Sequence, residues 1–234
     1  MALSEKSQMM NYSKQQFKTP VVFMVFNRPE KTQIVFNEIR QVRPEKFFIV
    51  ADGPRNKSDK PKCQAVRDII NTGIDWPCQV FRKYSDTNLG CKINIASGID
   101  WVFKNVEEAI FIEDDCVPDQ SFFPFCAELL EKYRHQEKIM QICGYNMAAL
   151  DKKFQCQDSY YFSNIGIMLG WASWRRAWKY YDVNVSRWPE VKKMGLLKNI
   201  LKDDAIVNHY NHLFDDYYNQ KVTAGTANGS WRAG

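Results

Sequence analysis

The chain lacks the cysteine spacing of a zinc site or a disulfide scaffold. Its seven cysteines are an odd number without close pairs, and no CxxC or Cys/His zinc spacing occurs. Small secreted domains instead carry even, closely spaced cysteines, whereas proteins of reducing compartments keep free thiols. We therefore expect free cysteines and a protein of the cytoplasm.

Long apolar runs and a leader-like start are missing as well. No apolar run approaches the roughly 20 residues that a helix needs to cross a bilayer. Residues 1–18 are polar and lack the apolar core of a signal peptide. We expect no membrane span, and place the protein either free in the cytoplasm or at the periphery of the inner membrane.

Charge of one sign is also scarce. The net charge is +5, and the basic residues are spread along the chain rather than clustered. This distribution is not that of a nucleic-acid-binding protein, and it leaves an anionic ligand or a membrane surface as the partner that charge favours. At 234 residues and 45% hydrophobic composition, the chain fits one large domain, or one domain with an appendage, and can bury a sizeable core.

Buried-strand patterns alternate with helical patterns through the first half of the chain. The strand patterns cover 21–26, 46–51, 78–81 and 109–112, and the helical patterns cover 30–42, 59–72 and 93–106. A helix at 125–135 and a strand at 139–143 follow. Strands and helices in this order predict an α/β fold with a Rossmann-like, mainly parallel sheet flanked by helices.

Three consecutive carboxylates follow the fourth strand pattern. The apolar residues 109–112 lead into Glu113, Asp114 and Asp115. Adjacent acids at a strand end repel one another unless a cation lies between them, and such hard oxygen ligands suit Mg²⁺ or Mn²⁺. The alternative is a solvated acidic turn.

Two other predicted strands also end in polar residues. Arg28 follows the first strand, and Asp52 and Arg55 follow the second. In open parallel sheets, ligands bind beyond the carboxyl ends of the strands. We therefore expect Arg28, Asp52 and the acidic triplet at one crevice, where they would form a site for a metal–nucleotide.

The region after residue 143 is rich in aromatic residues. Trp171, Trp174 and Trp178 recur at helical spacing, and core packing is the ordinary role of such a stripe. The functional alternative is a platform on which the apolar face of a sugar stacks. Gly170 just before the stripe indicates a tight backbone approach or a mobile loop.

Several ordered motifs resemble bacterial glycosyltransferases of the GT-A (nucleotide-diphospho-sugar transferase) fold, similar to the eukaryotic N-acetylglucosaminyltransferase I group. Some bacterial members carry the label "hemolytic protein HlpA-like". The resemblance covers about residues 20–182. The motifs are Pro20-Val21-Val22-Phe23 with Arg28-Pro29, Asp52-Gly53-Pro54, Asn88-Leu89-Gly90, Glu113-Asp114-Asp115 with Pro118-Asp119, and Gly170-Trp171-Ala172-Ser173-Trp174.

The resemblance implies a metal-dependent, inverting transfer of a sugar from a nucleotide-sugar donor, such as a UDP-sugar, to a glycan or lipid-linked acceptor. It implies Asp115 as the ligand of Mn²⁺ or Mg²⁺. The nucleotide-sugar contacts carried over are Arg28, Asp52, Glu113, Asp114, Gly170 and Trp171, and Arg55 is an added candidate for phosphate.

The last residues depart from the family pattern. The family continues with a Trp-Asp-x-Gln-Trp segment whose Asp matches the general base, whereas residues 223–234 are small residues with almost no core pattern. Their codons permit Asp-Arg-Trp-Asp-Cys-Gln-Trp in another reading frame. We therefore hypothesise a frameshift near Val222, and a natural short variant is the alternative.

This hypothesis divides the chain into a polar extension (1–18), an incomplete GT-A domain (19–222) and an irregular tail (223–234). Asp215 and Asp216 are weak substitutes for the missing base, with solvated helix surfaces as their alternative role. Two other functions stay open: a non-catalytic nucleotide-sugar binder or hemolysin-associated protein, and a nucleotidyltransferase. The last would need a glycine-rich phosphate loop, which Asn27-Arg28-Pro29-Glu30 does not supply.

Overall fold

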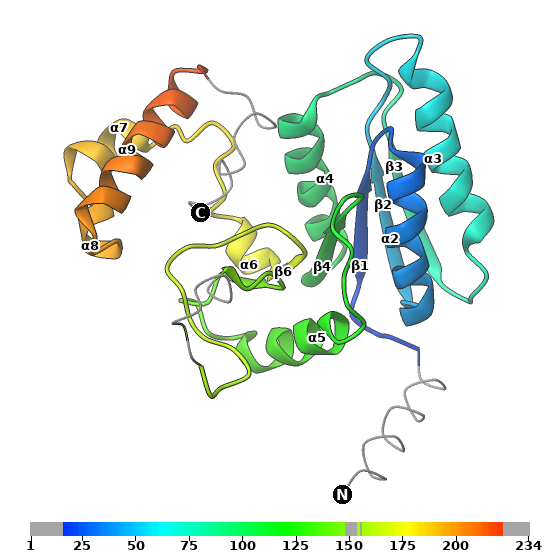
Figure 1. Ribbon diagram of the computed structural model, residues 1–234, viewed down its shortest axis with the longest axis horizontal. Coiled ribbons are helices and arrows are strands. Elements are labelled where there is room, and N and C mark those ends of the chain that lie inside the picture. The colour runs from blue at the N-terminus through cyan, green and yellow to red at the C-terminus, as the bar shows by residue number, and fades with distance from the viewer. Residues whose placement is uncertain (1–15, 148–153, 155, 222–234) are drawn as a thin grey trace, which may run out of the picture.

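The computed structural model describes residues 16–147, 154 and 156–221. Most of the expected N-terminal extension and the whole of the expected irregular tail lie outside these residues. The described part is an α/β fold with a mainly parallel sheet flanked by helices, as predicted (Figure 1). The sheet is mixed and has six strands, one more than the sequence patterns indicated.

The strands run in the order β3-β2-β1-β4-β6-β5. The first four are parallel to one another, and β6 is antiparallel to both of its neighbours. Their bounds are β1 Val21–Val25, β2 Lys46–Ala51, β3 Gln79–Tyr84, β4 Glu108–Glu113, β5 Gln141–Cys143 and β6 Trp171–Trp174.

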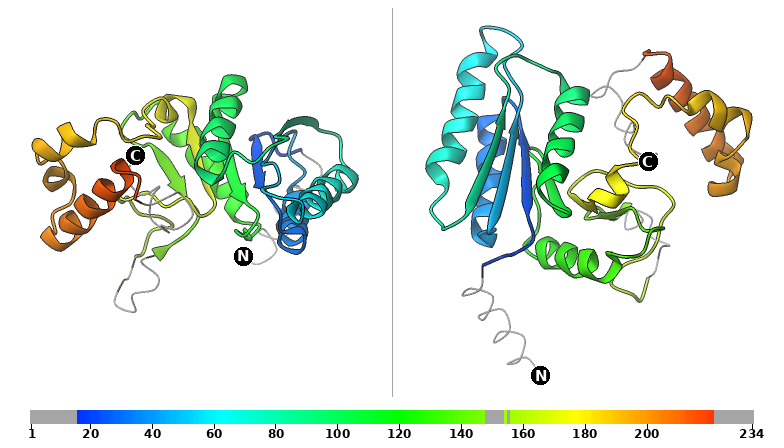
Figure 2. Two further views of the ribbon diagram at one scale, coloured as in Figure 1. Left: turned by 90° about the horizontal axis from the view of Figure 1, so that it is seen from above. Right: turned by 180° about the vertical axis from the view of Figure 1, so that it is seen from behind.

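Helices cover both faces of the sheet (Figures 1 and 2). Alternate residues of β1 enter two separate cores: Phe23 packs with α2, α3 and α5, whereas Met24 packs with α4. The alternation follows from the two-residue period of a strand. The helices of these layers are α2 Pro29–Val42, α3 Asp59–Gly73, α4 Cys91–Asn105, α5 Phe122–Tyr133 and the short α6 Arg175–Trp178.

The predicted elements up to residue 143 are therefore confirmed within a few residues at each end. The helical interpretation of the tryptophan stripe is wrong for Trp171 and Trp174, whereas Trp178 lies on the short helix α6. Trp171 and Trp174 lie on strand β6, and they are buried on opposite faces of the sheet, each in a different core. Core packing is thus confirmed for both, but through strand pairing with β4 rather than through a helix face.

The order of the strands places a crevice between β1 and β4. The chain leaves β1 and β2 through α2 and α3 on one face, and then crosses by α4 on the other face to reach β4. The loops after β1 and β4 both lead to helices on the face of α2, α3 and α5, but the strand order reverses between β1 and β4. Such a reversal is where ligands bind in open α/β sheets.

A separate group of helices follows the sheet. It consists of α7 Trp188–Lys193, α8 Leu197–Ile200 and α9 Asp204–Tyr218, which stand beside the sheet in Figure 1. The carboxylate of Asp203 begins α9 by accepting hydrogen bonds from the backbone N–H groups of Ala205 and Ile206. Across the part of the chain that the structure describes, every helix is too short or too polar to traverse a bilayer.

Candidate functional site

An arginine from the loop after β1 meets two acids from the loop after β4. The guanidinium of Arg28 lies 3.1 Å from the carboxylate of Asp114 and 2.6 Å from that of Asp115. Asp114 also accepts a hydrogen bond from the backbone N–H of Phe26 and is buried, whereas Arg28 and Asp115 are partly exposed. These contacts bring together the first and fourth strand ends as the sequence predicts.

The ion pairs of Arg28 are with Asp114 and Asp115, and Glu113, the third acid of the triplet, forms none with it. It lies on the α4 face of the sheet, because it pairs in register with Met24 of β1. Burial, and then the neighbouring charges of Asp115 and Asp114, raise the pKa of Glu113 to about 7, against a smaller opposing effect of Arg28. The site therefore holds more negative charge than its arginine neutralises.

Asp52 anchors the loop that leads into α4. Its carboxylate is buried and accepts hydrogen bonds from the backbone N–H groups of Gly53, Leu89 and Gly90, and from the side-chain amide of Asn88, at 2.8–3.0 Å. Both oxygens are engaged within the protein. Asp52 therefore positions the start of α4 beside the crevice, and its direct contact with a nucleotide stays a prediction.

Arg55 belongs to a network that the sequence did not reveal. Its guanidinium pairs with the buried carboxylate of Asp59 at 2.7 Å and lies over the ring of Phe26. Asp59 also accepts a hydrogen bond from the amide of Asn27 at 2.7 Å, next to Arg28. The hydrogen bond from Arg55 lowers the pKa of Asp59 to about 2. The four-residue spacing of Arg55 and Asp59 was the only available signal for this pair.

Trp171 lies beside the acidic triplet. Its ring stacks on Phe111 of β4 with the ring centroids 4.4 Å apart, and Glu113 follows two residues later on the same face. Trp171 is only 3% exposed, and its indole N–H has no hydrogen-bond partner among the described residues. A buried donor without a partner is costly, and a ligand oxygen would satisfy it.

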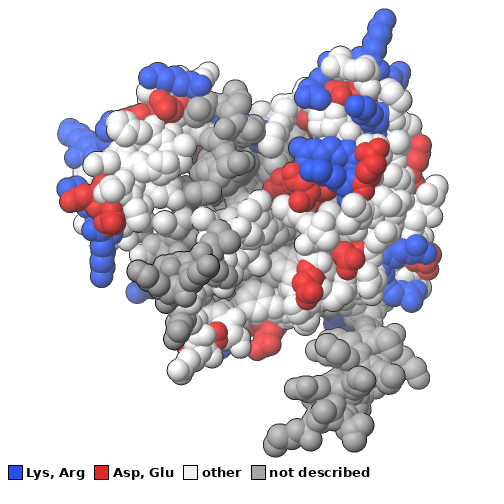
Figure 3. Space-filling model, in the orientation of Figure 1, with Lys and Arg blue, Asp and Glu red and all other residues white. Residues whose placement is uncertain are grey.

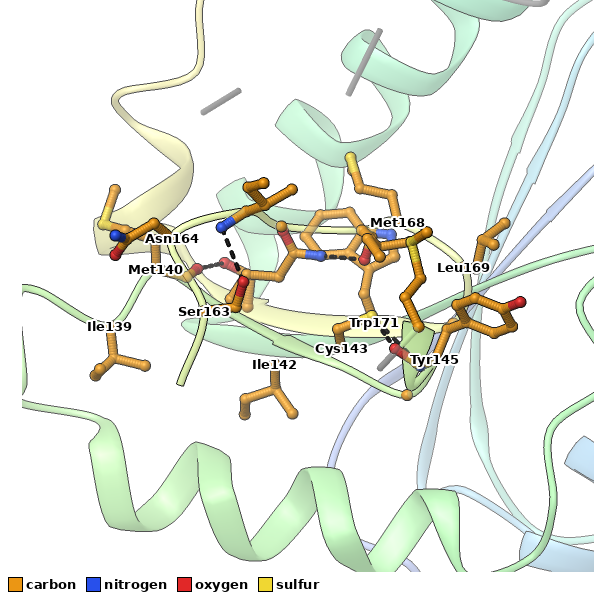
Figure 4. Close-up of a pocket in the computed structure, with 18 of the residues that line it drawn as sticks. Ile139, Met140, Ile142, Cys143, Tyr145, Ser163, Asn164, Met168, Leu169 and Trp171 are labelled. Atoms are coloured by element: carbon orange, nitrogen blue, oxygen red, sulfur yellow. Dashed lines mark hydrogen bonds between the residues drawn. The ribbon is translucent and has the colours of Figure 1, made fainter. Parts of the chain in front are cut away.

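Gly170 sets the backbone conformation immediately before strand β6. It adopts a positive φ of 63°, which side-chain-bearing residues rarely adopt, and its carbonyl accepts a hydrogen bond from the N–H of Gly144 at 2.8 Å. The ends of β5 and β6 are thereby held together. Figure 4 shows Tyr145 and Leu169 beside this junction.

A cavity of about 2020 Å³ opens from the acidic loop toward the helices α7–α9. Asp115, Gly170 and Trp171 line one part of it, and the lining elsewhere is largely aromatic, aliphatic and uncharged. Figure 4 shows one wall of this cavity, including Met140 and Trp171. In this region the amide of Gln141 donates a hydrogen bond to the carbonyl of Ile167, and the hydroxyl of Ser173 donates one to the carbonyl of Met140. In Figure 3 the surface between the two parts of the molecule is mostly uncharged. Arg28 and Asp52 are not among the residues that line this cavity, although Arg28 contacts Asp115, which does line it.

The residues present fit a hard divalent cation that shares its coordination with a ligand. Within the described ranges, no three His, Cys, Asp or Glu residues gather as a complete metal cage. Mg²⁺ and Mn²⁺ in phosphate-binding sites require only one or two carboxylates, and phosphate oxygens supply further ligands. Asp115 offers a partly exposed carboxylate. Burial raises the pKa of Glu113, and so, to a smaller extent, do the charges of Asp115 and Asp114, which a cation would offset.

The weak general-base candidates lie on α9, away from the Arg28 cluster. Asp215 accepts hydrogen bonds from the indole N–H of Trp188 at 2.9 Å and from Lys192 at 2.6 Å, so it joins α9 to α7. The carboxylate of Asp216 is about half exposed and lies 3.8 Å from the ammonium group of Lys221. Asp215 is therefore not the simple solvated acid that we considered as its alternative role.

No model of a known protein family matches the sequence, and no curated protein matches it significantly.

Proposed function

We propose that the protein is a metal-dependent glycosyltransferase with a GT-A fold, whose nucleotide-sugar donor binds at the crevice between β1 and β4. One observation carries the proposal. Arg28 and Asp115, which come from different strand ends, meet at 2.6 Å at the switch point of the sheet. A cation-binding carboxylate beside an arginine is the combination that a nucleotide diphosphate requires.

The two arginines would bind the diphosphate. Arg28 and Arg55 both expose about half of their side chains, and each is held by a buried carboxylate, Asp114 or Asp59. An arginine that is already oriented loses less conformational entropy when it binds phosphate. We expect Arg28 to exchange its contact with Asp115 for a phosphate oxygen when donor and cation bind.

Asp115, assisted electrostatically by Glu113, would hold Mn²⁺ or Mg²⁺. When bound, such an ion supplies Lewis-acid stabilisation of the charge that grows on the leaving diphosphate. The contribution of the chain itself would be to concentrate negative charge where the cation binds and to hold Arg28 next to Asp115.

The donor sugar would lie between Trp171 and Glu113. A sugar hydroxyl can accept a hydrogen bond from the indole N–H of Trp171 and donate one to the carboxylate of Glu113, which share one face of the sheet. This arrangement would satisfy the buried indole donor. The acceptor would then enter from the adjoining cavity, which Asp115 and Trp171 also line.

A non-catalytic binder of nucleotide sugars is the second candidate. The engagement of Asp215 by Trp188 and Lys192 favours it, because a carboxylate in these contacts is a poor proton acceptor. Product formation from the donor that binds separates the two functions.

Thermal shift with Mn²⁺ and a panel of UDP-, GDP- and dTDP-sugars tests the proposal. We expect one donor to raise Tm only when Mn²⁺ is present, and Asp115→Asn to abolish the shift. Asp119→Asn, an exposed acid in the same loop, is the matched control. Equal shifts in both variants, or none in the native chain, would contradict the proposal.

A further inference from the structure

We infer that the carboxyl end of the sheet is also a docking surface for membranes with anionic headgroups. This edge surface consists of the exposed apolar residues Leu89, Ile93 and Val117 and the exposed lysines Lys57, Lys60 and Lys62. The inference concerns binding and does not depend on the proposed transfer reaction.

Exposed apolar side chains gather at this end of the sheet. Leu89 is 40% exposed, Ile93 47% and Val117 59%, and they lie at the start of α4 and on the loop after β4. Tyr145, which follows β5, and Leu169, which precedes β6, are also exposed, and Figure 4 shows both near the junction of these two strands. A single exposed apolar residue is ordinary, but several around one opening indicate an interaction surface.

The loops that carry these residues adjoin one another. The amide of Asn88 donates a hydrogen bond to the carbonyl of Gly53 at 2.9 Å, which joins the loop before α4 to the loop before α3. Arg28 joins the loop after β1 to Asp115, two residues before Val117. The apolar and basic parts are thus neighbours on a continuous rim around the crevice.

The lysines of this rim lie on the loop before α3 and on its first turn. Lys57, Lys60 and Lys62 are exposed, and they form no ion pair with any acid in the described part of the chain. Asp59, the acid among them, is buried and already paired with Arg55. Figure 3 shows Lys and Arg gathered at this end of the molecule, over the start of α3 in the orientation of Figure 1.

A surface that combines exposed lysines with exposed apolar side chains can bind a membrane that carries anionic headgroups. Each lysine near such a membrane contributes about 1 kcal/mol of attraction, and apolar side chains add to it by entering the interface. A small anion in the crevice would need neither the outward lysines nor Leu89 and Val117. Docking in this orientation would turn the crevice toward the bilayer, where a lipid-linked acceptor lies if the proposed function holds.

Flotation of the full chain with vesicles tests the inference. We expect partitioning onto vesicles of phosphatidylcholine with 30% phosphatidylglycerol, weakened by salt, and little onto phosphatidylcholine alone. Replacing Lys57, Lys60 and Lys62 together by Gln should lower the partition coefficient about a hundredfold. The matched control replaces Lys18, Lys46 and Lys104 by Gln. These lie at the opposite edge of the sheet, before β1, at the start of β2 and at the end of α4.

The inference would be overturned if the protein did not partition onto anionic vesicles, or if the two triple variants lost vesicle binding equally. It would also be overturned if the protein self-associated in sedimentation experiments and only the variant of Lys57, Lys60 and Lys62 abolished that self-association. Because the Mn²⁺-dependent donor shift is measured without vesicles, failure here is distinguishable from failure of the proposed function. Leu89→Ser with Val117→Ser should reduce the binding that remains at high salt, and unchanged binding there would also contradict the inference.

Discussion

At the scale of single residues, each arginine of the crevice is supported by a buried acid. Arg28 is held by Asp114, and Arg55 by Asp59, which also receives the amide of Asn27. The sequence could predict Arg28 and the acidic triplet, because strand ends are visible as apolar runs followed by polar residues. It could not predict Asn27 with Asp59, since contact between positions 32 residues apart arises only from the fold.

The paired Asp59 should make the protein sensitive to acid. A carboxyl group whose folded pKa of about 2 lies below its ordinary 3.8 stabilises the fold above pH 4, and this stabilisation is lost as pH falls toward 2. Asp59→Asn should therefore be less stable than the native chain at pH 7, and it should lose less stability between pH 4 and 2.

Urea denaturation across this pH range measures the effect. Asp68→Asn, an exposed acid on α3, is the control and should follow the native profile. An Asp59→Asn profile parallel to that of the native chain would show that Asp59 has no such role.

At the scale of elements, Asp52 connects the end of β2 to the start of α4. Replacing it with Ala leaves the partly buried N–H groups of Leu89 and Gly90 without their acceptor. We expect Asp52→Ala to lower the free energy of unfolding by about 3 kcal/mol, and to speed hydrogen exchange of these two amides more than that of the strand centres. Asp86→Ala, in the same loop but exposed, should do neither.

The approach of α4 to the sheet depends on Gly98. A Cβ atom at this position would lie 2.7 Å from a methyl group of Val50 on β2. Gly98→Ala should therefore destabilise the native chain by about 1 kcal/mol, because overpacking outweighs the gain in helix propensity.

In a Val50→Ala background the same substitution should be neutral or stabilising, since the methyl group is gone. Denaturation of the four proteins of this cycle gives the coupling energy, which we expect to be about 1–2 kcal/mol. An identical effect of Gly98→Ala in both backgrounds would refute the close contact.

The elements differ in how well the sequence predicts them. Strands β1, β2 and β4 are continuous apolar runs and were predictable, as were the helices between them. The strand Trp171–Trp174 was not, because four residues carry little periodicity and its tryptophans also fit helical spacing. Only its pairing with β4 and β5 shows that the two tryptophans serve different cores.

At the scale of the whole molecule, the sheet and the helices α7–α9 enclose the large cavity between them. The two parts also meet where the ammonium group of Lys92 on α4 lies 4.9 Å from the ring centroid of Tyr217 on α9. The sequence could not predict this arrangement, because it depends on contacts more than 100 residues apart. It places a largely uncharged cavity next to Asp115, where the acceptor of the proposed transfer would enter.

The most direct test of the central claim is a crystal structure of the protein with UDP and Mn²⁺, with the ion located by its anomalous scattering. We predict a peak about 2 Å from a carboxylate oxygen of Asp115, bridged to the diphosphate, with Arg28 turned from Asp115 to a phosphate oxygen. A peak elsewhere, or a diphosphate bound away from both residues, would contradict the proposed site.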